Sequence, residues 1–436
     1  MLNKLQIYLF AALIFTLPFD IKTLIYQTEW YGGLFNPYAS VSISLSELLL
    51  YINSIIFLIK SFVGGKKIHT GDKSFFFIFI LLEFTAVLSL LLSDKEDSIL
   101  KFLTSLKVFD MLIFYILAVN QVLKITRMMK IFIMSMGLQA IIGIAQFILQ
   151  SDLGLGILGE QDLNRFNPQA AKFYIENMPI LRAYGTFAHP NIFSAYLLTS
   201  IMFIFIFWKK MKPIHKYILI ILQVVALLLT FSRSTLFAFI VAVVILSSWH
   251  LKSLDIRRRF KVLFISLIVL SQLFILWIYR ILSIFTDNSI SERIEGYKNA
   301  LKMFWDYPTG VGFNLSTLYL DKISDKNIPP WTYQPPHNIY LLILSEAGLL
   351  GATVLFSILG FLIYKLIMKN KNLMNIKERH IWRVFCCLLV SFVIITLFDH
   401  YFFTLEKGRY ISILNFSIFT VFLSSKGNIF PIKKGG

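Results

Sequence analysis

Long apolar runs alternate with short polar segments along almost the whole chain. The runs are roughly 17–25 residues long, which is the length that an α-helix needs to cross the hydrocarbon core of a bilayer. This pattern predicts an all-α polytopic membrane protein with about twelve transmembrane helices, in a single integral membrane domain over residues 1–436. The expected spans are 5–19, 41–63, 74–93, 99–123, 131–150, 189–208, 216–231, 234–250, 262–283, 338–367, 382–402 and 409–425.

The composition agrees with a membrane protein and argues against a soluble one. Hydrophobic residues make up 57% of the chain and charged residues only 15%, whereas about a quarter of the residues in a soluble domain are charged. Cys386 and Cys387 are adjacent, so they provide neither a disulfide framework nor a CxxC metal or redox motif. We expect them to be packing residues.

The net charge of +18 reflects membrane topology rather than nucleic-acid binding. Basic residues cluster in short tracts between the apolar runs and not along one soluble face, so no nucleic-acid partner is expected. If the N-terminus is cytoplasmic, the loops on that side hold most of the 42 lysines and arginines but only Asp72, Asp255 and Glu378 as acids. This distribution follows the positive-inside rule and predicts that both termini are cytoplasmic.

Two of the connections on the opposite, outer side are long, at about 151–188 and 284–336. Loops of more than about 15 residues in a compact protein are usually functional or disordered. These two are rich in Trp, Tyr, Phe, Pro and Gly, which favours folded lids, and we expect the second to carry part of an active site. The chain shows no internal repeat, which disfavours transporters built from repeats.

Some charged residues fall inside the predicted spans. Lys107 and Asp110 are three residues apart on one expected helix, so we expect them to pair with each other. Glu47, Glu83 and Glu346 are expected to be buried structural partners.

A histidine stands at the predicted start of a helix near the outer surface. Pro335 and Pro336 precede His337 and Asn338, and the apolar run begins at once afterwards, so Asn338 is expected to cap the helix. A helix N-terminus attracts anions such as phosphate and disfavours a protonated imidazole. A neutral histidine there suits a general base, while an interfacial histidine bound to water or backbone is an equally open reading.

Three arginines also fall on the outer side, against the orientation bias. They are Arg182 before the sixth span, Arg233 in the short turn between the seventh and eighth spans, and Arg293 in the second long loop, near Lys298. Guanidinium groups bind phosphate oxygens in a bidentate manner, so these arginines could clamp a diphosphate. Pairing with outer carboxylates is the alternative, and the candidates are Glu292, Glu295 and Asp399.

Asp399 and His400 lie at the outer end of the eleventh expected span, where they could orient a sugar or hold an arginine. A metal site formed by His189, His400, Asp399 and Glu406 is disfavoured because their spacing matches no known ligand pattern. Walker, GxGxxG and GxSxG motifs are missing, which argues against an ATP-driven pump, a dinucleotide enzyme or a serine hydrolase. No metal or cofactor is therefore expected.

At this point the motifs resemble those of the O-antigen ligase and polymerase superfamily. Ligases of that family carry a histidine, then Asn, Ser or Asp, nine residues, a glycine, two residues, and Gly, Thr or Tyr. His337, Asn338, Gly348 and Gly351 meet this pattern in full. The Arg-x3-Leu element is met only in part, because Phe237 follows Arg233. The Gly-Thr-Phe-x-His-Pro-Asn run at 185–191 and the Pro-x-Gly-x-Gly-Phe-Asn run at 308–314 are also typical of the superfamily. The resemblance extends from about residue 180 to 410.

The resemblance implies a metal-independent, inverting glycosyl transfer at the outer, periplasmic face of a bacterial inner membrane. The donor would be an undecaprenyl-diphosphate-linked glycan held among membrane lipid, and the acceptor a hydroxyl of a glycolipid such as lipid A-core. By the family pattern, Arg233 and Arg293 would grip the diphosphate, with Arg182 as a third arginine, and His337 would deprotonate or orient the hydroxyl. The further expected substrate contacts are His189, Asn191, Asn338, Asp399 and His400.

Three alternatives stay open. The first is a polysaccharide or O-antigen polymerase that uses the same donor with a repeat-unit acceptor. The second is a carrier of lipid-linked glycan, although its functional charges would be expected near the bilayer midplane rather than on the outer side. The third is a metal-dependent polyprenyl-phosphate glycosyltransferase that uses Asp20 in the first outer loop.

Overall fold

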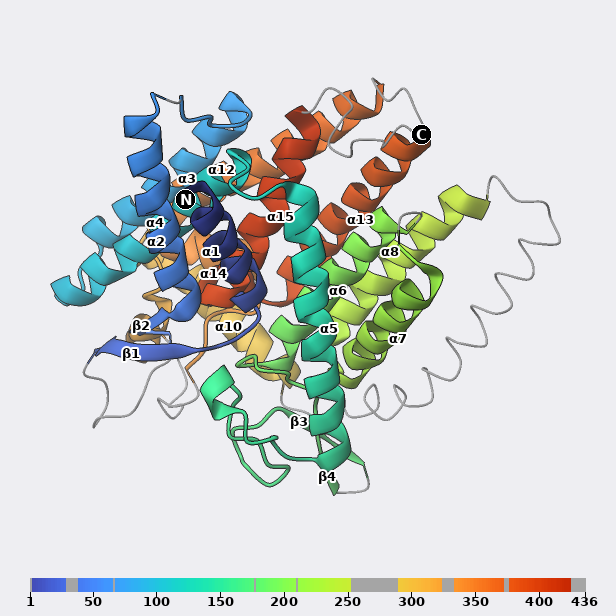
Figure 1. Ribbon diagram of the computed structural model, residues 1–436. Helices are drawn as coiled ribbons and strands as arrows, with labels where there is room; N and C mark the ends of the chain where they lie inside the picture. The colour runs from blue at the N-terminus through green and yellow to red at the C-terminus, as the bar shows by residue number, and fades with distance from the viewer. Residues whose placement is uncertain are drawn as a thin grey trace.

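The computed structural model describes residues 2–28, 38–65, 67–175, 178–208, 211–251, 289–323, 333–371 and 376–424. The fold is mostly helical, with two small antiparallel hairpins (Figure 1). The helices are α1 (Leu2–Thr16), α2 (Leu45–Val63), α3 (Lys73–Leu92), α4 (Ser98–Val119), α5 (Ile125–Leu149), α6 (Pro190–Phe207), α7 (Pro213–Leu229), α8 (Arg233–Leu251), α10 (Ser289–Asp306), α11 (Leu320–Ile323), α12 (Ile339–Lys371), α13 (Ile376–Phe398), α14 (Tyr401–Thr404) and α15 (Glu406–Ser424). The hairpins are β1 (Lys22–Gln27) with β2 (Ser40–Ser44), and β3 (Lys172–Ile175) with β4 (Met178–Leu181).

Within the described residues, seven helices are long and apolar enough to cross a membrane, namely α2 to α6, α12 and α13. Three shorter helices, α1, α7 and α8, are also apolar. Described helices overlap every predicted span except 262–283, which lies outside the described residues. A multi-pass helical membrane protein is therefore supported, while the count of twelve spans and the orientation stay predictions.

Local sequence signals define several helix starts. Ser44 and Glu47 form a capping box at α2, in which each side chain binds the backbone N–H of the other residue. The Asp72 carboxylate accepts the N–H groups of Ser74 and Phe75 at the start of α3. These caps satisfy backbone donors that no helical carbonyl can reach.

Two predicted span boundaries are corrected by the structure. Residues 41–44, assigned to the second span, form strand β2, and the helix begins only at Leu45. The eleventh span was expected to run to residue 402, but α13 ends at Phe398, so Asp399 and His400 lie beyond its end. The predicted pairing of Lys107 with Asp110 is also wrong, because Lys107 forms its ion pair with Glu47 on α2.

The two long loops contain regular structure. The segment 151–188 includes the hairpin β3–β4 and a short 3-10 helix, and Gln146 at the end of α5 binds the backbone of Tyr184 and Gly185. The segment 284–336 includes α10 and α11 in its described part. Both hairpins and α10 lie toward the same end of the helical bundle (Figure 1).

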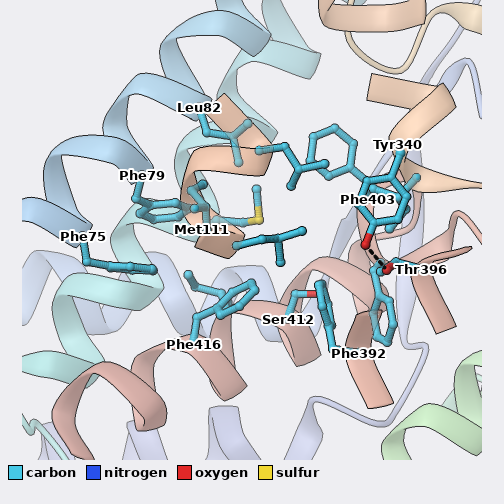
Figure 2. Close-up of a pocket in the computed structure, with 16 residues that line it drawn as sticks. Phe75, Phe79, Leu82, Met111, Tyr340, Phe392, Thr396, Phe403, Ser412 and Phe416 are labelled. Carbon is cyan, nitrogen blue, oxygen red and sulfur yellow. Dashed lines mark hydrogen bonds between the residues drawn. The ribbon is translucent and has the colours of Figure 1, made fainter. Parts of the chain in front are cut away.

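An apolar cavity of about 60 Å³ lies among α3, α12, α13 and α15. Phenylalanines line much of it, and the Tyr340 and Thr396 hydroxyls are hydrogen-bonded at 3.1 Å on one side (Figure 2). Tyr340 and Phe402 in its wall follow closely after His337 and His400 in the chain. The cavity therefore adjoins the segments that carry the candidate site.

Candidate active site

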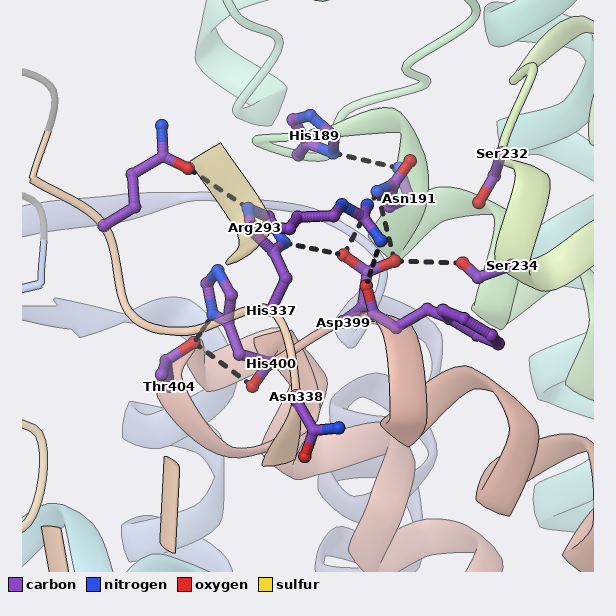
Figure 3. Close-up of polar contacts among 12 residues, drawn as sticks. His189, Asn191, Ser232, Ser234, Arg293, His337, Asn338, Asp399, His400 and Thr404 are labelled. Atoms are coloured by element: carbon purple, nitrogen blue, oxygen red, sulfur yellow. Dashed lines mark hydrogen bonds and ion pairs between the residues drawn. The ribbon is translucent and has the colours of Figure 1, made fainter. Parts of the chain in front are cut away.

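Residues from four separate segments meet beyond the ends of the membrane helices (Figure 3). His337 comes from the loop before α12, Asp399 follows α13, Asn191 lies in the first turn of α6, and Arg293 lies on α10. Most of the residues expected from the sequence to contact substrate are thus brought together.

The Asp399 carboxylate is the centre of this cluster. One oxygen lies 3.4 Å from Nδ1 of His337, and the other accepts a 2.9 Å hydrogen bond from the Ser234 hydroxyl. The Asn191 amide donates to both oxygens at 3.3 and 3.2 Å. Burial would raise the pKa of Asp399, but the hydrogen bond and the electrostatic interaction with His337, together with the charge of Arg293, outweigh it and bring the pKa to about 2. Asp399 is therefore an ionised carboxylate at neutral pH, although its side chain is only 4% exposed.

His337 is the most accessible member of the pair, with a side chain 28% exposed. An ionised carboxylate only accepts hydrogen bonds, so Asp399 favours the tautomer of His337 with its proton on Nδ1. Nε2 lies 3.3 Å from the end of the exposed Gln334 side chain. With the His337 proton on Nδ1, the Gln334 amide would turn so that its NH2 group donates to Nε2. The His337 carbonyl accepts a 3.2 Å bond from the Tyr297 hydroxyl of α10. Asp399 thus orients the His337 ring through Nδ1, while Nε2 lies on the side of the exposed Gln334.

The other two histidines of the site are held in place by protein groups. His189 accepts the Asn191 N–H at 3.1 Å as the cap of α6, and burial and the Arg182 charge lower the pKa of His189 to about 3. His400 shares a 2.8 Å hydrogen bond with Thr404, and its ring centre lies 4.9 Å from that of His337. Burial, followed by the charge of His337, lowers the pKa of His400 well below its usual range. Both rings are therefore neutral at pH 7.

The three arginines have different surroundings. Arg182 is buried, and it donates to the Thr230 carbonyl and to the Asn191 side chain, both at 2.6 Å. Arg293 donates at 3.1 Å to the carbonyl of Phe398, the residue before Asp399. Arg233 is partly exposed at the start of α8 and directly precedes Ser234. Arg293 therefore binds the residue before Asp399, and Arg233 precedes a residue that binds Asp399. Arg182 is linked to Asp399 through Asn191, whose amide donates to the carboxylate.

Asn338 caps α12 as expected, because its Oδ1 atom accepts the Leu341 N–H at 3.0 Å. Its amide also donates to the Leu397 carbonyl at 3.2 Å, which ties the start of α12 to the end of α13. A group of three or more His, Cys, Asp or Glu side chains that could bind a metal is not found among the described residues.

Comparison with known protein families gives one match. Residues 218–356 match the family model described as O-antigen ligase. The resemblance expected from the motifs is confirmed. A search of curated proteins returns no match. The O-antigen ligase match contains Arg233, Arg293, His337 and Asn338. Asn191 and Asp399 lie outside it but contact each other in the folded chain, so the site extends beyond the matched region.

Sequence reasoning missed three contributors to this candidate site. Ser234 adjoins Arg233, but nothing in its local sequence signals a bond to Asp399. Gln334 stands three residues before His337, in a segment without helical periodicity. Tyr297 could have been found, because it stands four residues after Arg293 and therefore shares its face of α10.

Proposed function

We propose that this protein transfers a glycan from undecaprenyl diphosphate to a hydroxyl group of an acceptor glycolipid, as an O-antigen ligase. The proposal is carried by the pairing of His337 with the buried, ionised Asp399, next to Arg293. Membership of the matched region in a family of glycosyltransferase-like ligases supports an enzyme of this class. The reaction would take place at the outer face of the bacterial inner membrane.

The chemistry follows from the orientation of His337. With its proton on Nδ1, the ring presents the Nε2 lone pair to an acceptor hydroxyl, which takes the place of the Gln334 side chain. Nε2 takes the hydroxyl proton as the oxygen attacks the anomeric carbon from the face opposite the diphosphate. The new glycosidic bond forms, the bond to the diphosphate oxygen breaks, and the configuration inverts. Asp399 stabilises the imidazolium that results.

The diphosphate gains negative charge as its bond to the anomeric carbon breaks, and cationic side chains can stabilise that charge. Arg293 and Arg233 are the proposed partners, because guanidinium groups can bind the developing negative charge in the transition state. Arg182 is less suited to that role, since two of its bonds go to Thr230 and Asn191. The long loops around the site would limit the access of water, which would otherwise hydrolyse the donor.

The acceptor separates two versions of the proposal. A complete histidine pattern from His337 to Gly351 favours a ligase that uses lipid A-core. Phe237 in place of the leucine after Arg233 is the observation that favours the alternative, a polymerase that uses a repeat-unit lipid as acceptor.

The decisive experiment incubates purified protein with undecaprenyl-diphosphate glycan and either lipid A-core or a repeat-unit lipid. We expect product with one acceptor, in the presence of EDTA, and loss of product in His337→Ala. His69→Ala is the matched control, because His69 is exposed and its backbone, not its ring, is hydrogen-bonded to Asn120. Absence of product with either acceptor, together with glycolipid transport in vesicles, would favour a carrier instead.

A further inference from the structure

The helix that begins next to His337 is broken at its third turn. Gly348 in α12 has φ 65° and ψ −166°, so the backbone leaves the helical conformation there and resumes it afterwards. A break of this kind removes hydrogen-bond partners from the carbonyls before it. In a membrane these carbonyls need other donors.

Residues 308–316, here called the docking segment, supply those donors. The Val311 N–H donates to the Ser345 carbonyl at 2.9 Å, and the Gly312 N–H donates to the Glu346 carbonyl at 3.0 Å. On the other side of the break, the Leu349 N–H donates to the Pro308 carbonyl at 3.3 Å. The docking segment is therefore bound through its backbone to both halves of α12.

The Glu346 side chain adds a second set of bonds to the same segment. Its carboxylate accepts the Asn314 N–H at 2.8 Å, the Ser316 hydroxyl at 2.7 Å and the Ser316 N–H at 3.4 Å. Glu346 is only 1% exposed, and all three of these groups are donors. The docking segment thus provides three hydrogen-bond donors to a buried carboxylate.

Two glycines permit this close approach. A Cβ atom at Gly348 would lie 2.4 Å from the Pro308 carbonyl oxygen, and one at Gly310 would lie 2.2 Å from the Glu346 carbonyl oxygen. Both residues also have positive φ, which L side chains rarely adopt. By contrast, a Cβ at Gly360 later in α12 would meet no atom within 4 Å.

The docking segment directly continues α10, the helix that carries Arg293. The Tyr307 N–H donates to the Met303 carbonyl, so α10 leads into the segment without a flexible linker. Midway along α10, the Tyr297 hydroxyl donates to the His337 carbonyl and so joins this helix to the start of α12. Helix α10 and the docking segment together are therefore attached to α12 at two points, one beside His337 and one at the break at Gly348.

We propose that the break at Gly348, together with Glu346, is a positioning device that sets Arg293 on α10 relative to His337 on α12. Glu346 and Gly348 are positioning residues, because their contacts in the described structure are with the docking segment and not with the groups proposed to react. This inference rests on the proposed roles of Arg293 and His337 in transfer. It assigns a purpose to Gly348, the first of the two glycines in the histidine pattern.

A double-mutant cycle in the full-length protein tests the coupling. Gly348→Ala is measured alone and together with Arg293→Ala, and Gly360→Ala is the matched control in the same helix. We expect Gly348→Ala to raise the donor KM roughly tenfold in the native background and to change it little once Arg293 is absent. The Gly360→Ala variant should match the unmodified protein.

Additive effects of Gly348→Ala and Arg293→Ala on the donor KM would overturn the inference, since a purely structural defect acts whether or not Arg293 is present. If Arg293→Ala itself leaves the donor KM unchanged, the proposed function fails instead. Should Gly348→Ala not fold, Glu346→Gln takes its place in the cycle. An amide NH2 would then face groups that are themselves donors, and the same non-additive rise in donor KM is expected.

Discussion

Replacing Asp399 by asparagine tests the centre of the proposed mechanism. The change keeps the size of the side chain but removes its charge and turns one acceptor oxygen into a donor. His337, Asn191 and Ser234 all direct hydrogen-bond donors at this carboxylate. An amide can satisfy only some of them. If its NH2 faces His337, it favours the tautomer with the proton on Nε2, which removes the lone pair needed to accept the hydroxyl proton.

The size of the effect follows from the Asp399 pKa. A shift from 3.8 to about 2 corresponds to about 2 kcal/mol of preferential stabilisation of the ionised form. If the same interactions stabilise the imidazolium in the transition state, their loss slows transfer by roughly 30-fold. The change in tautomer would add to that loss. Donor binding should change little, because the arginines are proposed to hold the diphosphate.

The assay is glycan transfer between purified lipids, with kcat and donor KM measured separately for Asp399→Asn. Asp321→Asn is the control, because Asp321 is an exposed carboxylate on α11. Thermal unfolding of each variant shows whether the fold is retained. A kcat within threefold of the unmodified protein would refute the idea that Asp399 orients and stabilises His337.

Three further predictions follow from other contacts. Ser234→Ala removes one of the donors to Asp399 and should lower kcat by roughly three- to tenfold without changing donor KM, as measured in the same assay. Gly185→Ala places a Cβ 2.6 Å from the Gln139 side chain at φ +61° and should destabilise the fold by about 1–3 kcal/mol in chemical or thermal unfolding. Because the pKa of His400 is lowered in the folded chain, its imidazole is protonated below about pH 6.5 in the unfolded chain but stays neutral in the folded chain. Stability is therefore complete above pH 6.5 and should fall by up to about 2 kcal/mol on going to pH 5. An unfolding series against pH should show a smaller decline in His400→Asn, and an identical decline would contradict the assignment.

Much of the helical layout could be predicted because a membrane demands continuous apolar runs of a fixed length. The break in α12 was not predicted, because apolar residues continue on both sides of Gly348 and the hydropathy pattern does not register a change in backbone angle. The hairpin β1–β2 was missed for a related reason. Its second strand, Ser40–Ser44, merges with the apolar start of α2, so pattern alone assigned both to one helix.

The candidate site shows a similar division. Motifs identified His337, Asn191 and Asp399 as residues of interest, since each is a polar group beside a helix end. Their mutual contacts depend on how α6, α12 and α13 pack, and no local signal encodes a bond between residues 208 positions apart. Arg182 illustrates the limit best. Its charge predicted a phosphate contact, but the folded chain surrounds it with the Thr230 carbonyl and the Asn191 side chain.

The attachment of residues 308–316 to α12 has a consequence for engineering. Exchange of outer loops between related enzymes is an obvious route to altered sugar preference. In this protein, the backbone N–H groups of a grafted loop would have to reach the Ser345 and Glu346 carbonyls of α12 with the same geometry as Val311 and Gly312. A chimera should therefore exchange the loop together with the Glu346–Gly348 turn of α12, because the loop and the helix break are hydrogen-bonded to each other.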